Sequence, residues 1–124
     1  MSDIRVGVIG VGIMGAGHAR YITDSVDGAV VTAFFDLDAA RMDALAKELS
    51  AKSGANINQH SSVDALVNDP TVDAVIICSP DGLHPEHLEL CVKAKKPTLC
   101  EKPLAPRLEV AKKIAEIVKS SGVP

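Results

Sequence analysis

Apolar residues occur along this chain in two alternating patterns. Short, nearly continuous apolar runs predict strands that are buried on both faces. Between them, apolar residues recur at helical spacing, as at Met42, Leu45, Ala46 and Leu49. The predicted strands span residues 4–9, 30–35, 56–60, 72–78 and 98–100. The predicted helices span residues 13–26, 38–52, 61–68, 85–95 and 107–120.

This regular alternation of strands and helices predicts the α/β class. Right-handed crossovers then give a Rossmann-type doubly wound parallel sheet. That sheet uses six strands in the order 3-2-1-4-5-6, and we count five in these 124 residues. We therefore expect residues 1–124 to form one domain, without the sixth strand and without a C-terminal domain.

The first predicted strand runs directly into a glycine-rich turn, GVGIMG over residues 10–15. In the G-x-G-x-x-G fingerprint, the first glycine allows a tight turn, the second lets a pyrophosphate approach, and the third lets helix pack on strand. Asp36 ends the next long strand, about 20 residues later, where a carboxylate can hold ribose hydroxyls. Free amides at the start of the following helix favour phosphate. A turn without a ligand is the alternative, and the spacing argues against it.

Two more predicted strands are followed by residues that could contact a ligand or take part in catalysis. Ser79 and Pro80 follow the strand over 72–78, and Glu101 and Lys102 follow the strand over 98–100. Because carboxyl ends of parallel strands share one edge of the sheet, these residues are expected at the ligand-binding edge. Lys102 is a candidate to reach the reacting end of a dinucleotide. The alternative is that Glu101 and Lys102 are solvated loop charges.

In order and spacing, these motifs resemble those of the glucose–fructose oxidoreductase, inositol dehydrogenase and rhizopine-catabolism family of NAD(P)-dependent oxidoreductases. The resemblance covers essentially the whole chain, and its most distinctive part is Glu101-Lys102-Pro103. The matching segments are residues 10–15, His18-Ala19, Asp36, Cys78-Ser79-Pro80, His84 and residues 101–103.

The resemblance implies that the protein oxidises a secondary alcohol of a sugar or polyol, as an inositol dehydrogenase does, by hydride transfer to NAD. It assigns catalysis to Lys102, beside the nicotinamide and the substrate hydroxyl. In the family an aspartate and a histidine of a second domain complete the site, so we expect this chain alone to be inactive. The resemblance also implies a cis peptide bond between Lys102 and Pro103.

Asp36 favours NAD over NADP, because a carboxylate repels a 2′-phosphate by about 4 kcal/mol at ~4 Å and an effective dielectric near ~20, before screening. Asp38 adds like charge, and Arg41 is the counter-charge nearby. A role of Asp36 as a helix cap is the alternative. The motif and the resemblance together assign NAD contacts to Gly10, Gly12, Ile13, Met14, Gly15, Asp36, Leu37, Arg41, Cys78, Ser79, Pro80, His84, Glu101 and Lys102.

Other polar residues carry weaker signals. His84 precedes Pro85, and we interpret it as a helix cap rather than an acid or base. Ser79 lacks a base at local spacing, so we interpret Ser79-Pro80 as a turn beside the nicotinamide ribose. Glycine inside a helix costs about 1 kcal/mol relative to alanine. We attribute its presence at Gly17 to close packing or to access for a phosphate. The remaining histidines are given a structural role or none: His18, His60 and His87.

Composition narrows the function classes. The three cysteines have no ligand spacing, which predicts reduced thiols in a cytoplasmic protein and no metal site. A net charge of −3 without interleaved aromatic and basic residues argues against nucleic acid and membrane partners. The expected partners are a small-molecule sugar or polyol and, in the full-length protein, further copies of itself.

Two other functions compete with the oxidoreductase. A non-catalytic dinucleotide-binding or regulatory domain would share the glycine-rich turn. A methyltransferase would share both the turn and a ribose-binding acid, but Glu101-Lys102-Pro103 argues against it.

Overall fold

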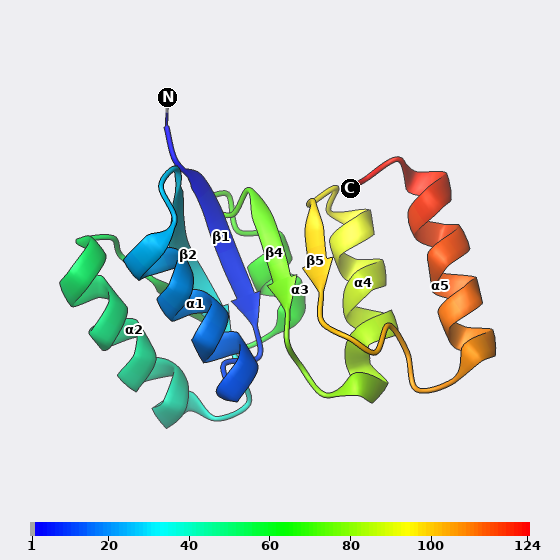
Figure 1. Ribbon diagram of the computed structural model, residues 1–124, viewed down its shortest axis with the longest axis horizontal. Helices are drawn as coiled ribbons and strands as arrows, with labels where there is room; N and C mark the ends of the chain where they lie inside the picture. The colour runs from blue at the N-terminus through cyan, green and yellow to red at the C-terminus, as the bar shows by residue number, and fades with distance from the viewer. Residues whose placement is uncertain (1) are drawn as a thin grey trace.

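The computed structural model describes residues 2–124 and contains a five-stranded parallel sheet (Figure 1). Its strands are β1 (Ile4–Ile9), β2 (Ala29–Phe35), β3 (Asn58–His60), β4 (Ala74–Ile77) and β5 (Thr98–Cys100). The order across the sheet is β3-β2-β1-β4-β5, and all four neighbouring pairs are parallel. This confirms the α/β class and the predicted strand order.

The five predicted helices are present, with ends shifted by a few residues. They are α1 (Ile13–Ser25), α2 (Ala39–Ser53), α3 (Val63–Val67), α4 (His84–Lys93) and α5 (Leu108–Ser121), and a 3-10 turn, η1 (Asp81–Leu83), precedes α4. The Asp38 side chain caps α2 by accepting the Arg41 N–H at 3.0 Å, and Ser62 caps α3 through the Ala65 N–H at 3.0 Å. Both helices therefore begin at the residue that follows their capping side chain.

Strand β4 is shorter than the run of apolar residues predicts. The Val72 N–H donates to the Asp69 carbonyl oxygen at 3.0 Å, which is a turn bond rather than a ladder bond. Asp73 pairs with Arg5 instead, through its backbone N–H and both carboxylate oxygens. The ladder with β1 consequently starts at the next residue, Ala74.

Helices cover both faces of the sheet at β1 and β2, which explains why these two strands are largely apolar. Helices α1 and α2 pack on one face, α3 and α4 pack on the other, and α5 packs against α4 (Figure 1). The first core is centred on Val6, Val8, Val31, Phe34, Leu45 and Leu49. The second is centred on Ile9, Val75, Ile77, Leu66, Leu88 and Ile114. All five strands end at one edge, where α1 also begins, and the predicted site residues lie there (Figure 1).

Candidate functional site

The glycine-rich turn leaves no room for side chains at its first and last glycines. Gly10 has φ of +87°, and a Cβ there would lie 2.7 Å from the Cys78 carbonyl oxygen. A Cβ on Gly15 would lie 1.7 Å from the Gly10 carbonyl oxygen. The turn therefore packs directly on the end of β4 and on its own helix, as the fingerprint predicts.

The middle glycine has a different environment, because its missing side chain leaves open space. The nearest atom to a Cβ built on Gly12 is Arg41 Nη1, at 3.7 Å. Gly12 is the N-cap of α1 and supplies no capping side chain, and the first turn of α1 contains no acidic residue. Ile13 is 94% exposed and Met14 56% exposed. The amides of this turn have no acceptor within the helix, so the geometry suits a phosphate.

Asp36 lies across from this turn and is bound to it. Its Oδ2 accepts the Val11 N–H at 2.8 Å, and its Oδ1 accepts the Asp38 N–H at 2.8 Å. The helix cap of α2 is Asp38, not Asp36. Since a carboxylate offers about four acceptor positions, two such bonds leave Asp36 capacity for two ribose hydroxyls.

A cleft of about 520 Å³ runs along this edge and gathers most of the predicted residues. Its predicted members are Gly10, Gly12, Asp36, Leu37, Arg41, Cys78, Ser79 and Pro80. Its lining also includes residues that the sequence did not single out: Phe35, Val63, Leu83 and His87. The other predicted contacts are not part of this lining: Ile13, Met14, Gly15, His84, Glu101 and Lys102.

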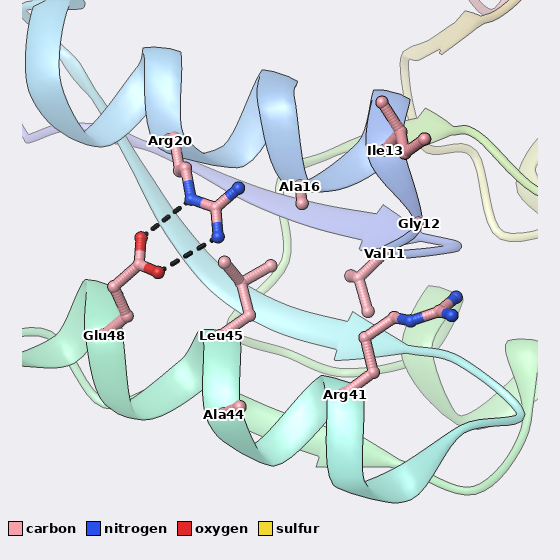
Figure 2. A pocket seen from close by; sticks show the side chains of 9 residues that line it. All are labelled: Val11, Gly12, Ile13, Ala16, Arg20, Arg41, Ala44, Leu45 and Glu48. Carbon is pink, nitrogen blue, oxygen red and sulfur yellow. Dashed lines mark hydrogen bonds and ion pairs between the residues drawn. The ribbon is translucent and has the colours of Figure 1, made fainter.

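A second hollow, of about 580 Å³, lies between α1 and α2 (Figure 2). At one end, Arg20 forms a two-pronged ion pair with Glu48, with N–O distances of 2.8 and 3.0 Å. Arg41 lies at the other end, beside Val11 and Gly12 (Figure 2). Arg41 borders both hollows and brings positive charge to the open side of the turn.

The loop after β5 is tied to the first helix through Glu101. Glu101 Oε1 lies 2.7 Å from His18 Nε2, and this hydrogen bond is the main cause that holds the pKa of Glu101 below its usual range. The Lys102 side chain follows at an exposed position. The Lys102–Pro103 peptide bond is cis, as predicted. His18 thus contacts the predicted Glu101 directly.

His84 does not cap its helix, which corrects the sequence-based interpretation. Helix α4 begins at His84 itself, and its N-cap residue, Leu83, makes no side-chain capping bond. The His84 side chain is 1% exposed. Its Nδ1 lies 2.7 Å from the Pro103 carbonyl oxygen and its Nε2 lies 2.7 Å from the Ser79 carbonyl oxygen. The ring therefore joins the loops after β4 and β5.

Ser79 has a histidine partner after all, which local spacing did not reveal. Ser79 Oγ lies 2.7 Å from His87 Nδ1, one helical turn beyond His84. Burial lowers the pKa of His87, with the charge of His84 acting in the same direction and that of Glu86 opposing. A neutral His87 fixes the Ser79 hydroxyl at the wall of the cleft.

Cys78 lines the cleft, but neither it nor Cys100 offers a reactive thiol there. Burial raises the pKa of both Cys78 and Cys100 to about 11, so their thiols stay protonated and unreactive. Gly17 faces open space, which removes close packing as its explanation.

Across residues 2–124, the side chains form no group that would hold a metal ion. Among the helices described, none is long and apolar enough to cross a membrane.

The comparison with protein families decides what kind of dinucleotide-binding fold this is. Residues 4–124 match a family described as an oxidoreductase family with an NAD-binding Rossmann fold, the glucose–fructose oxidoreductase, inositol dehydrogenase and MocA group. The chain belongs to this family. Family membership removes the methyltransferase alternative and accounts for the glycine-rich turn and Asp36 together.

The curated relatives and solved structures to which the chain is similar include inositol and sugar dehydrogenases. The chain is 42% identical over 121 residues to inositol 2-dehydrogenase 2 of Saccharopolyspora erythraea, covering 98% of this chain and 34% of that protein. The myo-inositol dehydrogenase of Lactobacillus casei, solved with NAD(H) and myo-inositol, superposes with a TM-score of 0.87 at 32% identity, covering 95% of this chain and 34% of that one. UDP-N-acetylglucosamine 3-dehydrogenase of Acidithiobacillus ferrooxidans superposes with a TM-score of 0.81 at 31% identity, covering 99% and 36%. The chain thus spans about a third of the length of these proteins.

Proposed function

We propose that residues 1–124 are the NAD-binding domain of an oxidoreductase that oxidises a secondary alcohol of inositol or a similar polyol. The observation that carries the proposal is the meeting of an open Gly12, the Asp36 carboxylate and the loop of Lys102 at one edge of the sheet. The inositol dehydrogenases among the relatives support this substrate class.

The residues present fit a dinucleotide. The first-turn amides of α1 would hold the pyrophosphate above Gly12, with Arg41 as an additional positive charge. Asp36 would accept the hydroxyls of the adenine ribose, and its charge favours NAD over NADP. The Ser79-Pro80 turn would line the nicotinamide side of the cleft. When bound, NAD supplies the acceptor for the hydride that leaves the alcohol carbon.

Lys102 is the residue of this chain that we assign to catalysis. A neutral Lys102 amine would take the proton of the substrate hydroxyl as the hydride leaves carbon, and would become an ammonium. The alcohol thereby loses one hydride and one proton and becomes a ketone. We assign the selection of the substrate to the part of the relatives that this chain does not span. The contacts of a homo-oligomer are assigned to the same part.

A chimera tests the proposal with the chemistry intact. Residues 1–124 would replace the matching segment of the Saccharopolyspora erythraea relative, and the product would be assayed for NAD-dependent oxidation of myo-inositol. We expect activity, and a loss of kcat of about 100-fold or more on Lys102→Ala, as for loss of a general base. The matched control is Lys112→Ala, an exposed position on α5. Full activity in Lys102→Ala would contradict the assignment.

The non-catalytic alternative makes a different prediction for the same chimera. A domain that only senses the dinucleotide would bind NADH in the chimera without supporting turnover. A folded, NADH-binding chimera that leaves myo-inositol unchanged would therefore favour the regulatory alternative over the dehydrogenase.

A further inference from the structure

One buried side chain at this edge has a hydrogen-bonding pattern that a neutral ring does not satisfy. His84 places each of its two ring nitrogens 2.7 Å from a backbone carbonyl oxygen, those of Pro103 and Ser79. Carbonyl oxygens only accept hydrogen bonds, so each nitrogen must carry a proton to bond its partner. A neutral imidazole has one such proton and leaves one nitrogen lone pair facing an oxygen. The imidazolium form has two and satisfies both carbonyls.

The two carbonyls belong to the segments that flank the reacting end of the proposed site. Ser79 follows β4 and lines the cleft, and Pro103 follows Lys102 after β5. The backbone of the Lys102 loop starts from the sheet, where the Glu101 N–H donates to the Ile77 carbonyl oxygen at 3.0 Å. His84 holds the same loop again, two residues later. Lys102 is thus anchored on both sides of its own position.

We propose that His84, as an imidazolium that donates to both carbonyls, is the positioning residue that holds the Lys102 loop against the Ser79 loop. It acts through the backbone and does not line the cleft itself. The two histidines of α4 thus have different roles. His87 remains neutral and orients the Ser79 hydroxyl, whereas His84 carries the positive charge. Two hydrogen bonds from a charged donor offset part of the cost of burying that charge.

The inference rests on the proposed function in one respect, namely that Lys102 is the residue whose placement matters. Its structural half is tested on the 124-residue chain without any turnover. In NMR spectra of the ¹⁵N-labelled chain near neutral pH, both ring nitrogens of His84 should show a bound proton. In His84→Gln, the amides of Glu101 and Lys102 should exchange with solvent at least about tenfold faster, as loss of one hydrogen bond implies, while the amides of β1 keep their rates.

A matched control separates positioning from a general loss of stability. His60→Gln removes a less buried histidine at the end of β3, which bonds Asp69 at 2.7 Å at the opposite edge of the sheet from β5. It should leave the exchange of the Lys102 amide unchanged. A His84 ring nitrogen without a proton, or an unchanged Lys102 exchange rate in His84→Gln, would overturn the inference.

The chimera then tests the functional half. His84→Gln should lower kcat by about 100-fold, the penalty of a small misplacement of a catalytic group, while the KM for NAD stays close to that of the parent. A fall in NAD affinity with kcat retained would overturn the positioning role. An inactive parent chimera counts against the proposed function instead, and the NMR measurements still decide the inference about His84.

Discussion

The Val11 N–H donates to Asp36 Oδ2 over 2.8 Å, so the glycine-rich turn and the Asp36 carboxylate are directly connected. Both oxygens of Asp36 are engaged by backbone amides, since Oδ1 accepts the Asp38 N–H at 2.8 Å. The carboxylate is therefore fixed in place where the adenine ribose would lie. This arrangement is the basis for the preference for NAD over NADP that we propose.

Replacing Asp36 should change which cofactor binds. In Asp36→Ser, we expect NADH affinity to fall by about 10- to 100-fold, as for loss of hydrogen bonds to a charged group. NADPH should gain relative to NADH, because the repulsion of the 2′-phosphate is gone while Arg41 remains. Titration calorimetry with both cofactors checks this. Asp43→Ser, on the exposed side of α2, is the control, and an unchanged preference in Asp36→Ser would refute the role.

Two neighbouring glycines of α1 should respond oppositely to alanine. Gly17→Ala places a methyl group in open space and should raise the free energy of unfolding by about 1 kcal/mol through helix propensity. Gly15→Ala forces a methyl group onto the Gly10 carbonyl oxygen and should lower it by about 1–3 kcal/mol. Urea unfolding measures both. Equal effects at the two positions would contradict the packing of the turn on its helix.

The sequence predicted those parts of the site that are determined by residues close together in the chain. Gly10, Gly15 and Asp36 are required by one turn and one strand end, and their spacing in the chain already expresses that geometry. The strand order followed from the alternation of elements and the handedness of their crossovers.

The parts that the sequence did not predict depend on how separate loops meet. His87 reaches Ser79 only because η1 turns the chain before α4 begins, and local spacing does not show that turn. His84 joins carbonyls that lie 5 residues before it and 19 residues after it. Side chains that bond backbone carbonyls leave no residue-type pattern at their partners, so no motif marks this contact.

Acid should destabilise the domain through a buried carboxylate beside β3. Asp69 accepts hydrogen bonds from Asn58, His60 and Thr71 at 2.7–2.9 Å. Burial raises the pKa of Asp69, but these bonds outweigh it and hold the pKa well below its usual range. Because the unfolded chain binds the proton more readily, this stability is present above about pH 4 and is lost as the pH falls further.

The variant Asp69→Asn isolates that effect. It should lower the free energy of unfolding at pH 7 by about 2 kcal/mol, because buried donors lose their acceptor. Between about pH 4 and pH 2 its stability should fall less steeply than that of the wild type. Urea unfolding at several pH values makes the comparison. The same steepness in both proteins would show that Asp69 does not carry the acid dependence.

In the proposed function, the open space over Gly12 receives the pyrophosphate of NAD. Calorimetric titration of the 124-residue chain with NADH, beside Gly12→Ala, tests it directly. The protein itself leaves room for the added methyl group, since the nearest atom lies at 3.7 Å, so the variant should stay folded with only the small loss of stability that alanine brings at an N-cap. We predict saturable binding at one site in the wild type and a Kd at least about tenfold weaker in Gly12→Ala, as for the loss of about 1.4 kcal/mol. No saturation in the folded wild type, or equal binding by the two proteins, would contradict the account.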